Sequence, residues 1–159
     1  ADRGVRPRVA VLGSREWWGP RRLQRRFCAE VGRALAQRFT GLELVTNGQA
    51  AVQQEVAEAF LLEAESLGRV GPAELSVRLL MPGDVPDAVA GPLLAARLES
   101  RTGSVALLVA GNSHAEARSA LADAADAYVL VSGGPGSADI AGRVHAAQRP
   151  VLCVPWTGG

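Results

Sequence analysis

Residues 128–147 read YVLVSGGPGSADIAGRVHAA and hold the most informative pattern of the chain. The continuous apolar run Tyr128–Val131 is followed by the glycine-rich stretch Ser132–Ser137 and then by a helix-forming stretch from Ser137 to Ala147. An apolar run without alternation, such as this one or Val105–Ala110, is typical of a strand that is covered on both faces, as in parallel sheets. The order of strand, glycine loop and helix therefore predicts one unit of a parallel α/β fold.

The same alternation of strand and helix extends to both sides of this stretch. Apolar runs predict further strands at Val9–Leu12, Leu42–Thr46, Leu75–Leu80, Val105–Ala110 and Val151–Val154. Helices are expected at Pro20–Phe39, Ala50–Leu67 and Leu93–Leu98, and from the capping box Ser113-His114-Ala115-Glu116 to about Ala125. The sequence therefore predicts a single α/β domain over residues 1–159, with a doubly wound, mostly parallel, Rossmann-like sheet and helices on both faces.

Two helices carry side-chain patterns that predict how they pack. In Pro20–Phe39, large apolar residues recur at steps of four and predict the buried face; they are Leu23, Phe27, Val31, Leu35 and Phe39. In Ala50–Leu67, a stripe of Val52, Val56 and Phe60 is expected to be buried, and Glu55, Glu58, Glu63 and Glu65 are expected to be mostly solvated. The two cysteines, Cys28 and Cys153, lie in apolar stretches without metal-ligand spacing, so we expect buried, reduced thiols and no metal site.

The charge of the chain is unevenly distributed. All 17 basic residues are arginine, which excludes a Schiff-base lysine and a Walker-type lysine. Residues 1–40 hold ten arginines against three acids, and the remainder holds seven against thirteen, so the two parts carry +7 and −6. This asymmetry suggests an anionic partner for the N-terminal part, and the alternative is a solvated helix face.

Sequence features also bear on the compartment of the protein. The longest apolar run near the middle of the chain, Val105–Ala110, is far shorter than the roughly 20 residues of a membrane span. No signal-peptide pattern follows Ala1. We therefore expect a soluble protein, either organellar (in a plastid, after N-terminal processing) or cytoplasmic.

Candidate binding residues lie where strands lead into helices, because ligands of parallel sheets bind at the carboxyl ends of the strands. The glycine-rich stretch before a helix N-terminus is a pattern for phosphate binding, although a tight turn that only packs the helix on its strand remains the alternative. His114 and Arg118 lie four residues apart and share a helix face, as supporting donors or as solvated side chains. The predicted cofactor-binding residues are Gly13, Ser14, Asn47, Gly48, His114, Arg118, Gly133, Gly134, Gly136 and Ser137.

Tryptophans and arginines near the N-terminus are candidates for a different role. Trp17 and Trp18 follow the first strand and could stack on a base, cap the pocket or bury against a partner chain. Together with Arg22, Arg25, Arg26 and Arg33 they form the expected surface for a protein partner. No nucleophile–base pair is recognisable, so no catalytic residue is predicted.

Several segments together resemble a known family. These are Val9–Ser14, Val45–Gly48, Leu121–Tyr128 and Gly133–Ser137. They are similar to the LOG-like (lysine-decarboxylase-like, SLOG) Rossmann superfamily, which includes cytokinin-activating phosphoribohydrolases and molybdenum-cofactor carrier proteins. The Gly133–Ser137 loop and Gly111–Glu116 look most like the algal carrier-like branch. The resemblance implies binding of a nucleotide, a pterin cofactor or a phosphate, and self-association into a homo-oligomer.

The departures from the hydrolase pattern concern its chemistry. The motif P-G-G-x-G-T-x-x-E falls on Ser132–Ile140, so that Ile140 replaces the family's catalytic glutamate. The family's Arg-Lys pair falls on Ala117-Arg118, its T-G-G on Thr46-Asn47-Gly48, and a later loop glycine on Ala51. Isoleucine cannot transfer a proton, and bulk at glycine positions blocks the close approach of a ligand.

Three functions follow as hypotheses. The first is a non-catalytic assembly or structural subunit of a larger complex, organellar and even photosynthetic, with a vestigial phosphate-type pocket. The second is a nucleotide- or cofactor-binding carrier that uses the Gly133–Ser137 loop. The third, an active nucleoside-monophosphate phosphoribohydrolase, is opposed by Ile140. No nucleic-acid partner is expected.

Overall fold

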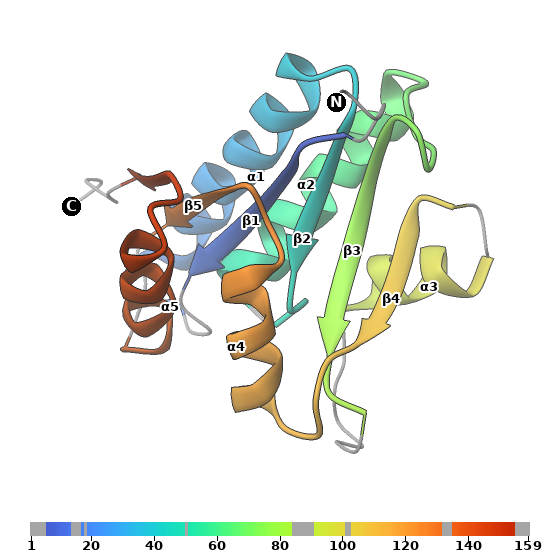
Figure 1. Cartoon of the computed structure of the whole chain (residues 1–159). Helices are drawn as coiled ribbons and strands as arrows, with labels where there is room; N and C mark the ends of the chain where they lie inside the picture. Colours follow the sequence, from blue (N-terminus) through green and yellow to red (C-terminus); the bar gives the residue numbers. More distant parts are fainter. Residues whose placement is uncertain are drawn as a thin grey trace.

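The described residues form one six-stranded parallel sheet with five helices (Figure 1). The structure, a computed structural model, describes residues 6–13, 17, 19–49, 51–83, 91–100, 103–131 and 135–154, with the backbone alone for 135–139 and 154. The strands are β1 (Arg8–Gly13), β2 (Leu42–Thr46), β3 (Leu75–Met81), β4 (Val105–Val109), β5 (Ala127–Val131) and β6 (Val151–Val154). The helices are α1 (Arg21–Arg38), α2 (Val52–Ser66), α3 (Pro92–Ser100), α4 (His114–Asp123) and α5 (Pro135–Ala146).

The order of the strands is β4-β3-β2-β1-β5-β6, and all their pairings are parallel. The chain moves outward from β1 to β4 and then returns to the other side of β1. Because parallel crossovers are right-handed, the reversal places the later helices on the opposite face of the sheet. The predicted doubly wound fold is confirmed, and its topological switch point lies between β1 and β5.

Each face of the sheet has its own hydrophobic core. On one face, α1, α2 and α3 contribute Cys28, Ala36, Val56, Phe60 and Leu94 to a cluster with alternate residues of β1–β5. On the other face, Ala117 and Leu121 of α4 and Ile140 and Val144 of α5 pack on Ala10 and Leu12 of β1. The central strand β1 is buried from Val9 to Gly13, which explains why this part of the strand is purely apolar.

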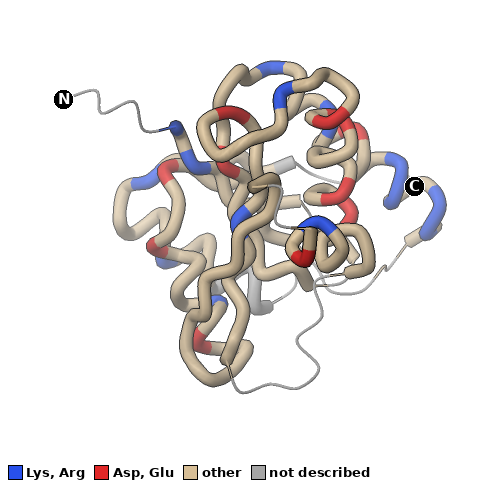
Figure 2. The backbone as a smooth tube through the Cα atoms, turned by 90° about the vertical axis from the view of Figure 1, so that its right-hand side faces the viewer, with Lys and Arg blue, Asp and Glu red and all other residues tan. Residues whose placement is uncertain are grey.

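The prediction that Val105–Ala110 is covered on both faces was wrong. β4 is an edge strand, and Leu107, Leu108 and Val109 are 47%, 46% and 61% exposed. The β4 side of the molecule faces the viewer in Figure 2, where this strand is tan because it has no charged residue. A continuous apolar run predicts burial only if the strand has neighbours on both sides, and the sequence alone does not give its position in the sheet.

The expectation of buried thiols holds for one cysteine only. Cys28 is buried in α1, and burial, with a smaller effect of the Glu55 charge, raises its pKa to about 12. Cys153 is exposed on β6, the other edge strand. The two thiols thus differ in burial because Cys153 lies on an edge strand.

The helices α1 and α2 approach each other through small residues. The buried residues of α1 are Gln24, Cys28, Gly32 and Ala36, one position away from the predicted apolar row. A side chain at Gly32 would overlap the carbonyl oxygen of Val56 and lie 2.8 Å from the backbone nitrogen of Phe60. The backbones are therefore in contact there. Phe27, Val31 and Leu35 pack at the side of this contact, while Leu23 and Phe39 are exposed.

The glutamates of α2 are not mostly solvated, contrary to the prediction. Glu55 pairs with Arg25 of α1 at 2.8 Å, and Glu63 accepts a hydrogen bond from Gln37 of α1 at 2.9 Å. Glu65 pairs with Arg97 of α3 at 2.6 Å, and Glu58 accepts from the backbone N–H of Leu93 at 3.3 Å. Burial raises the pKa of Glu58. These acids connect α2 to its neighbouring helices.

Among the described helices, none combines the length and apolar character that crossing a membrane requires.

Candidate ligand site at the carboxyl edge of the sheet

The two strands of the switch point end side by side. Gly13, the last residue of β1, is in register with Val131, the last residue of β5. A side chain at Gly13 would overlap Val52 of α2, so close packing requires glycine at this predicted binding position.

Asn47 connects the end of β2 to two other elements. Its Nδ2 donates to the carbonyl oxygens of Leu80 on β3, at 3.0 Å, and of Ala117 on α4, at 3.2 Å. These two acceptors fix the orientation of the amide. Its Oδ1 is buried and has no hydrogen-bond donor in the described part of the chain. A buried acceptor of this kind needs a hydrogen-bond donor from outside the described residues.

The loop after β2 is held by a residue that the sequence analysis did not single out. Oε1 of the buried Gln53 accepts from Thr46 Oγ1 at 2.6 Å and from the backbone N–H of Asn47 at 2.8 Å. Gly48 follows with a positive φ of 68°, a conformation that favours glycine. Gln53 could have been found in the sequence, because it is a polar residue that lies beside the apolar stripe of Val52 and Val56.

Gln49 brings His114 to this loop. Nε2 of Gln49 lies 3.2 Å from Nδ1 of His114, the first residue of α4. An amide nitrogen donates, so with the Gln49 amide in this orientation Nδ1 is the acceptor and the ring N–H lies on Nε2. His114 therefore retains one N–H donor beside the β2–α2 loop. The sequence predicted His114 but not Gln49.

The predicted capping box holds His114 in place. Ser113 Oγ accepts from the backbone N–H of Glu116 at 3.1 Å. The Glu116 carboxylate in turn accepts from the N–H of Asn112, one residue earlier than in the usual box. Arg118 is half-buried on the next turn of α4. We refer to Gly13, Asn47, Gly48, Gln49 and His114 as the carboxyl-edge site.

The glycine-rich stretch lies only partly within the described residues. Ser14, Gly133 and Gly134 fall outside them. The last helix was expected to begin at Ser137, and this was wrong: α5 begins at Pro135, so Gly136 and Ser137 belong to its first turn. Proline suits the first helical position because its fixed φ is helical and its missing N–H would be unpaired there.

Ile140 points into the protein core. It is 2% exposed and belongs to the cluster between α5, α4 and β1. The position that carries the catalytic glutamate in the family pattern is therefore filled here by an apolar core residue. In the described parts of the chain, no three His, Cys, Asp or Glu residues come together as a metal site.

The residues predicted to meet a partner lie on the α1 side. Trp17 is half-buried against the core beneath α1, and Trp18 lies outside the described residues. Arg22, Arg25 and Arg26 are exposed.

No protein-family model matches the sequence, and a search of curated proteins gives no match. Solved structures do match. The molybdenum cofactor binding protein from the phototrophic bacterium Rippkaea orientalis superimposes with a TM-score of 0.65 and 18% identity, over 96% of this chain and 78% of that one. The Moco carrier protein from Chlamydomonas reinhardtii gives 0.61 and 21%, with the same coverage. The structural-genomics target TM1055 gives 0.64 and 23%, over 91% and 72%. The chain thus shares a parallel, Rossmann-like α/β fold with these solved structures.

Proposed function

We propose that the protein binds a phosphate-bearing heterocycle, a nucleotide or a pterin-type cofactor, at the carboxyl-edge site and carries it without altering it. The observation that carries this proposal is the buried Asn47 Oδ1, which lacks a donor among the described residues. Purine and pterin rings both have N–H groups that could donate to it once the loop after β2 shifts, because solvent does not reach Oδ1 in this structure. His114 Nε2–H would be available to a phosphate oxygen.

The names of two proteins with the same fold support the choice of ligand class. One is described as a molybdenum cofactor binding protein and the other as a Moco carrier protein. The location supports it as well, because the site lies at the carboxyl ends of parallel strands, where ligands of such sheets bind.

The proposal includes that the protein does not convert its ligand chemically. A phosphoribohydrolase of the family pattern needs a glutamate where this chain has the buried Ile140. Without a group that exchanges protons at this position, general acid–base catalysis has no candidate there. We therefore expect binding without release of free base from a nucleoside monophosphate.

Calorimetric titration with adenosine monophosphate, with inorganic phosphate as a control, tests the binding proposal. We expect saturable binding that His114→Ala weakens about tenfold, the loss of one hydrogen bond to a charged group. His145→Ala is the matched control, because His145 is exposed at the end of α5 and should leave binding unchanged. A folded protein that gives no heat at millimolar ligand would refute binding of this nucleotide, and release of adenine would refute the carrier role.

A second candidate function, a structural subunit of a larger complex, is favoured by the uncovered edge strand β4. Its exposed Leu107, Leu108 and Val109 form an apolar edge that proteins usually cover or protect with charges. Size measurement in an extract of the native cells tests this role. Migration as a complex would support it, and migration as a free monomer would contradict it.

A further inference from the structure

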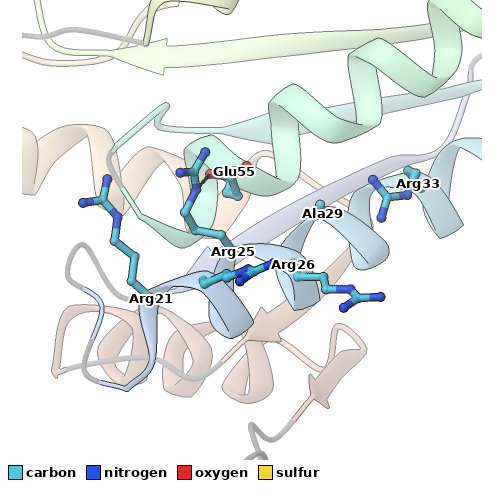
Figure 3. Close-up of a pocket in the computed structure, with 7 residues that line it drawn as sticks. Arg21, Arg25, Arg26, Ala29, Arg33 and Glu55 are labelled. Atoms are coloured by element: carbon cyan, nitrogen blue, oxygen red, sulfur yellow. Dashed lines mark hydrogen bonds and ion pairs between the residues drawn. The ribbon is translucent and has the colours of Figure 1, made fainter.

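The outer face of α1 forms a basic groove of about 750 Å³. Figure 3 shows its arginine side chains extending from α1, with Arg25 reaching across to Glu55 of α2. The groove is lined by Arg21, Arg22, Arg25, Arg26, Ala29, Arg33 and Glu55. Its wall thus combines five arginines with one carboxylate.

Most of this positive charge is not neutralised within the chain. Arg25 pairs with Glu55 at 2.8 Å and Arg33 with Glu30 at 2.7 Å. In the described part of the protein, Arg21, Arg22 and Arg26 have no acidic partner within ion-pair distance. They are exposed, so their guanidinium groups are available to an external anion.

Helix geometry arranges these charges in rows. Arg21, Arg25, Ala29 and Arg33 follow one another at steps of four, and Arg22 and Arg26 form the adjacent row. At 1.5 Å per residue, the row from Arg21 to Arg33 is about 18 Å long. The small Ala29 leaves space between the charged ends. The groove therefore suits an elongated anion better than a single phosphate.

The lining argues against nucleic acid as the occupant. Single strands are bound by aromatic side chains that stack on the bases, and none lines this groove. Nucleic-acid-binding domains usually have a pI above about 9. This chain has a pI of about 8.1 and a net charge of +1.

A protein segment fits the remaining features. Guanidinium groups bind carboxylates through paired hydrogen bonds, so a row of them matches a row of acidic side chains. Leu23 lies next to Arg22 in the sequence and one turn before Arg26, and it is 45% exposed. It does not line the groove, but it offers an apolar contact beside the arginines. A segment that mixes acidic and apolar residues would use both.

We propose that the basic groove on α1 is a docking site for an acidic segment of a partner protein. This inference is independent of the carboxyl-edge ligand site, because none of its residues belongs to that site. Close packing of α1 on α2 through Gly32 fixes the buried face of the helix, so the arginine rows are held outward.

Fluorescence anisotropy with a labelled peptide tests the proposal. The probe is a peptide of about 12 residues, rich in glutamate with leucine at every fourth position, which as a helix would be about as long as the arginine row. We expect binding that weakens with salt and that Arg26→Glu reduces about tenfold. The double variant Arg22→Glu/Arg26→Glu should reduce it about a hundredfold.

Arg38→Glu is the matched control, because Arg38 is exposed on the same helix but does not line the groove. Arg38→Glu should change the affinity for the peptide less than about threefold, although it alters the net charge of the protein as much as Arg26→Glu does. Arg26→Gln provides a milder change in case charge reversal perturbs folding, which circular dichroism would detect. Binding of adenosine monophosphate should be the same in all these variants.

Four outcomes would overturn the proposal. Equal weakening by Arg38→Glu would mean a general attraction of charge without a specific site. Failure of the peptide to bind the folded protein would exclude the acidic segment. Binding that depends on Arg26 for an oligonucleotide or anionic lipid vesicles, but not for the peptide, would assign the groove to another class of partner. Self-association abolished by Arg26→Glu in analytical ultracentrifugation would assign it to a second copy of this chain.

Discussion

At the scale of single residues, Ala51 has a backbone conformation that suits glycine. It precedes α2 with φ 69° and ψ −114°, where its Cβ is unfavourable, and it is buried. In the family pattern that the sequence resembles, a loop glycine also falls at this position. The loop after β2 thus keeps the path of a glycine-containing loop although the glycine is absent, and strain of this kind is concentrated at functional sites.

Replacement of Ala51 by glycine should therefore stabilise the protein. We expect Ala51→Gly to raise the free energy of unfolding by about 1 kcal/mol, because relief of the strain outweighs the added flexibility of the unfolded chain. Urea denaturation measures the change. Ala96→Gly, at an exposed position inside α3, is the control and should lose about 1 kcal/mol. Equal losses in both variants would show that Ala51 is unstrained.

At the scale of secondary-structure elements, the contact of α1 with α2 depends on a missing side chain. Gly32 lets the two backbones touch, and Cys28 and Ala36 continue this row of small residues on either side. Hydrophobic periodicity favours large apolar residues and therefore indicated the neighbouring row. The closest approach of two helices instead selects the smallest residues, because they allow the largest contact between the helix surfaces.

Gly32→Ala should force the helices apart. We expect a loss of about 2 kcal/mol or more in the free energy of unfolding, as in other overpacked cores, despite the better helix propensity of alanine. Gly142→Ala in α5 is the control, because a Cβ there meets no atom within 4 Å. It should gain about 0.5 to 1 kcal/mol from helix propensity alone. Thermal and urea denaturation of both variants would compare them, and a stable Gly32→Ala protein would contradict the close contact.

At the scale of the whole molecule, Glu43 holds the amino edge of the sheet together. Its buried carboxylate on β2 lies 2.9 Å from Arg8 of β1, 3.0 Å from Arg78 of β3 and 3.5 Å from Arg6. Arg6 also donates to the hydroxyl of Ser76 at 2.7 Å. One carboxylate thus connects three strands and the segment before β1, at the edge opposite the candidate ligand site.

Removal of this carboxylate charge should destabilise the entire fold. We expect Glu43→Gln to lower the free energy of unfolding by about 2 to 3 kcal/mol at neutral pH, because it leaves the partly buried Arg6 and Arg78, and the exposed Arg8, without their counter-charge. Glu30→Gln is the control. Its pair with Arg33 is exposed, so the change should stay within about 0.5 kcal/mol. Comparable small losses in both variants would mean that the network at Glu43 contributes little.

The order of the elements and the class of fold follow from local sequence patterns alone. Apolar runs and helical periodicity are local properties, so β2 was predicted with its observed bounds and every other strand and helix close to its position. The sequence also predicted the capping box at Ser113 and the burial of Val52, Val56 and Phe60. Glycine and strand-to-helix positions also indicated the carboxyl edge as the place to look for a ligand.

Other features depend on tertiary packing. They are the position of each strand in the sheet, the buried row of α1 and the hydrogen-bond partners of the polar residues. Leu107 and Cys153 are exposed because β4 and β6 have a neighbour on one side only. The contact of Gln49 with His114 joins residues 65 positions apart, and no local pattern encodes it. Local sequence determines the conformation of each segment, whereas burial and side-chain contacts depend on the packing of segments that are distant in the chain.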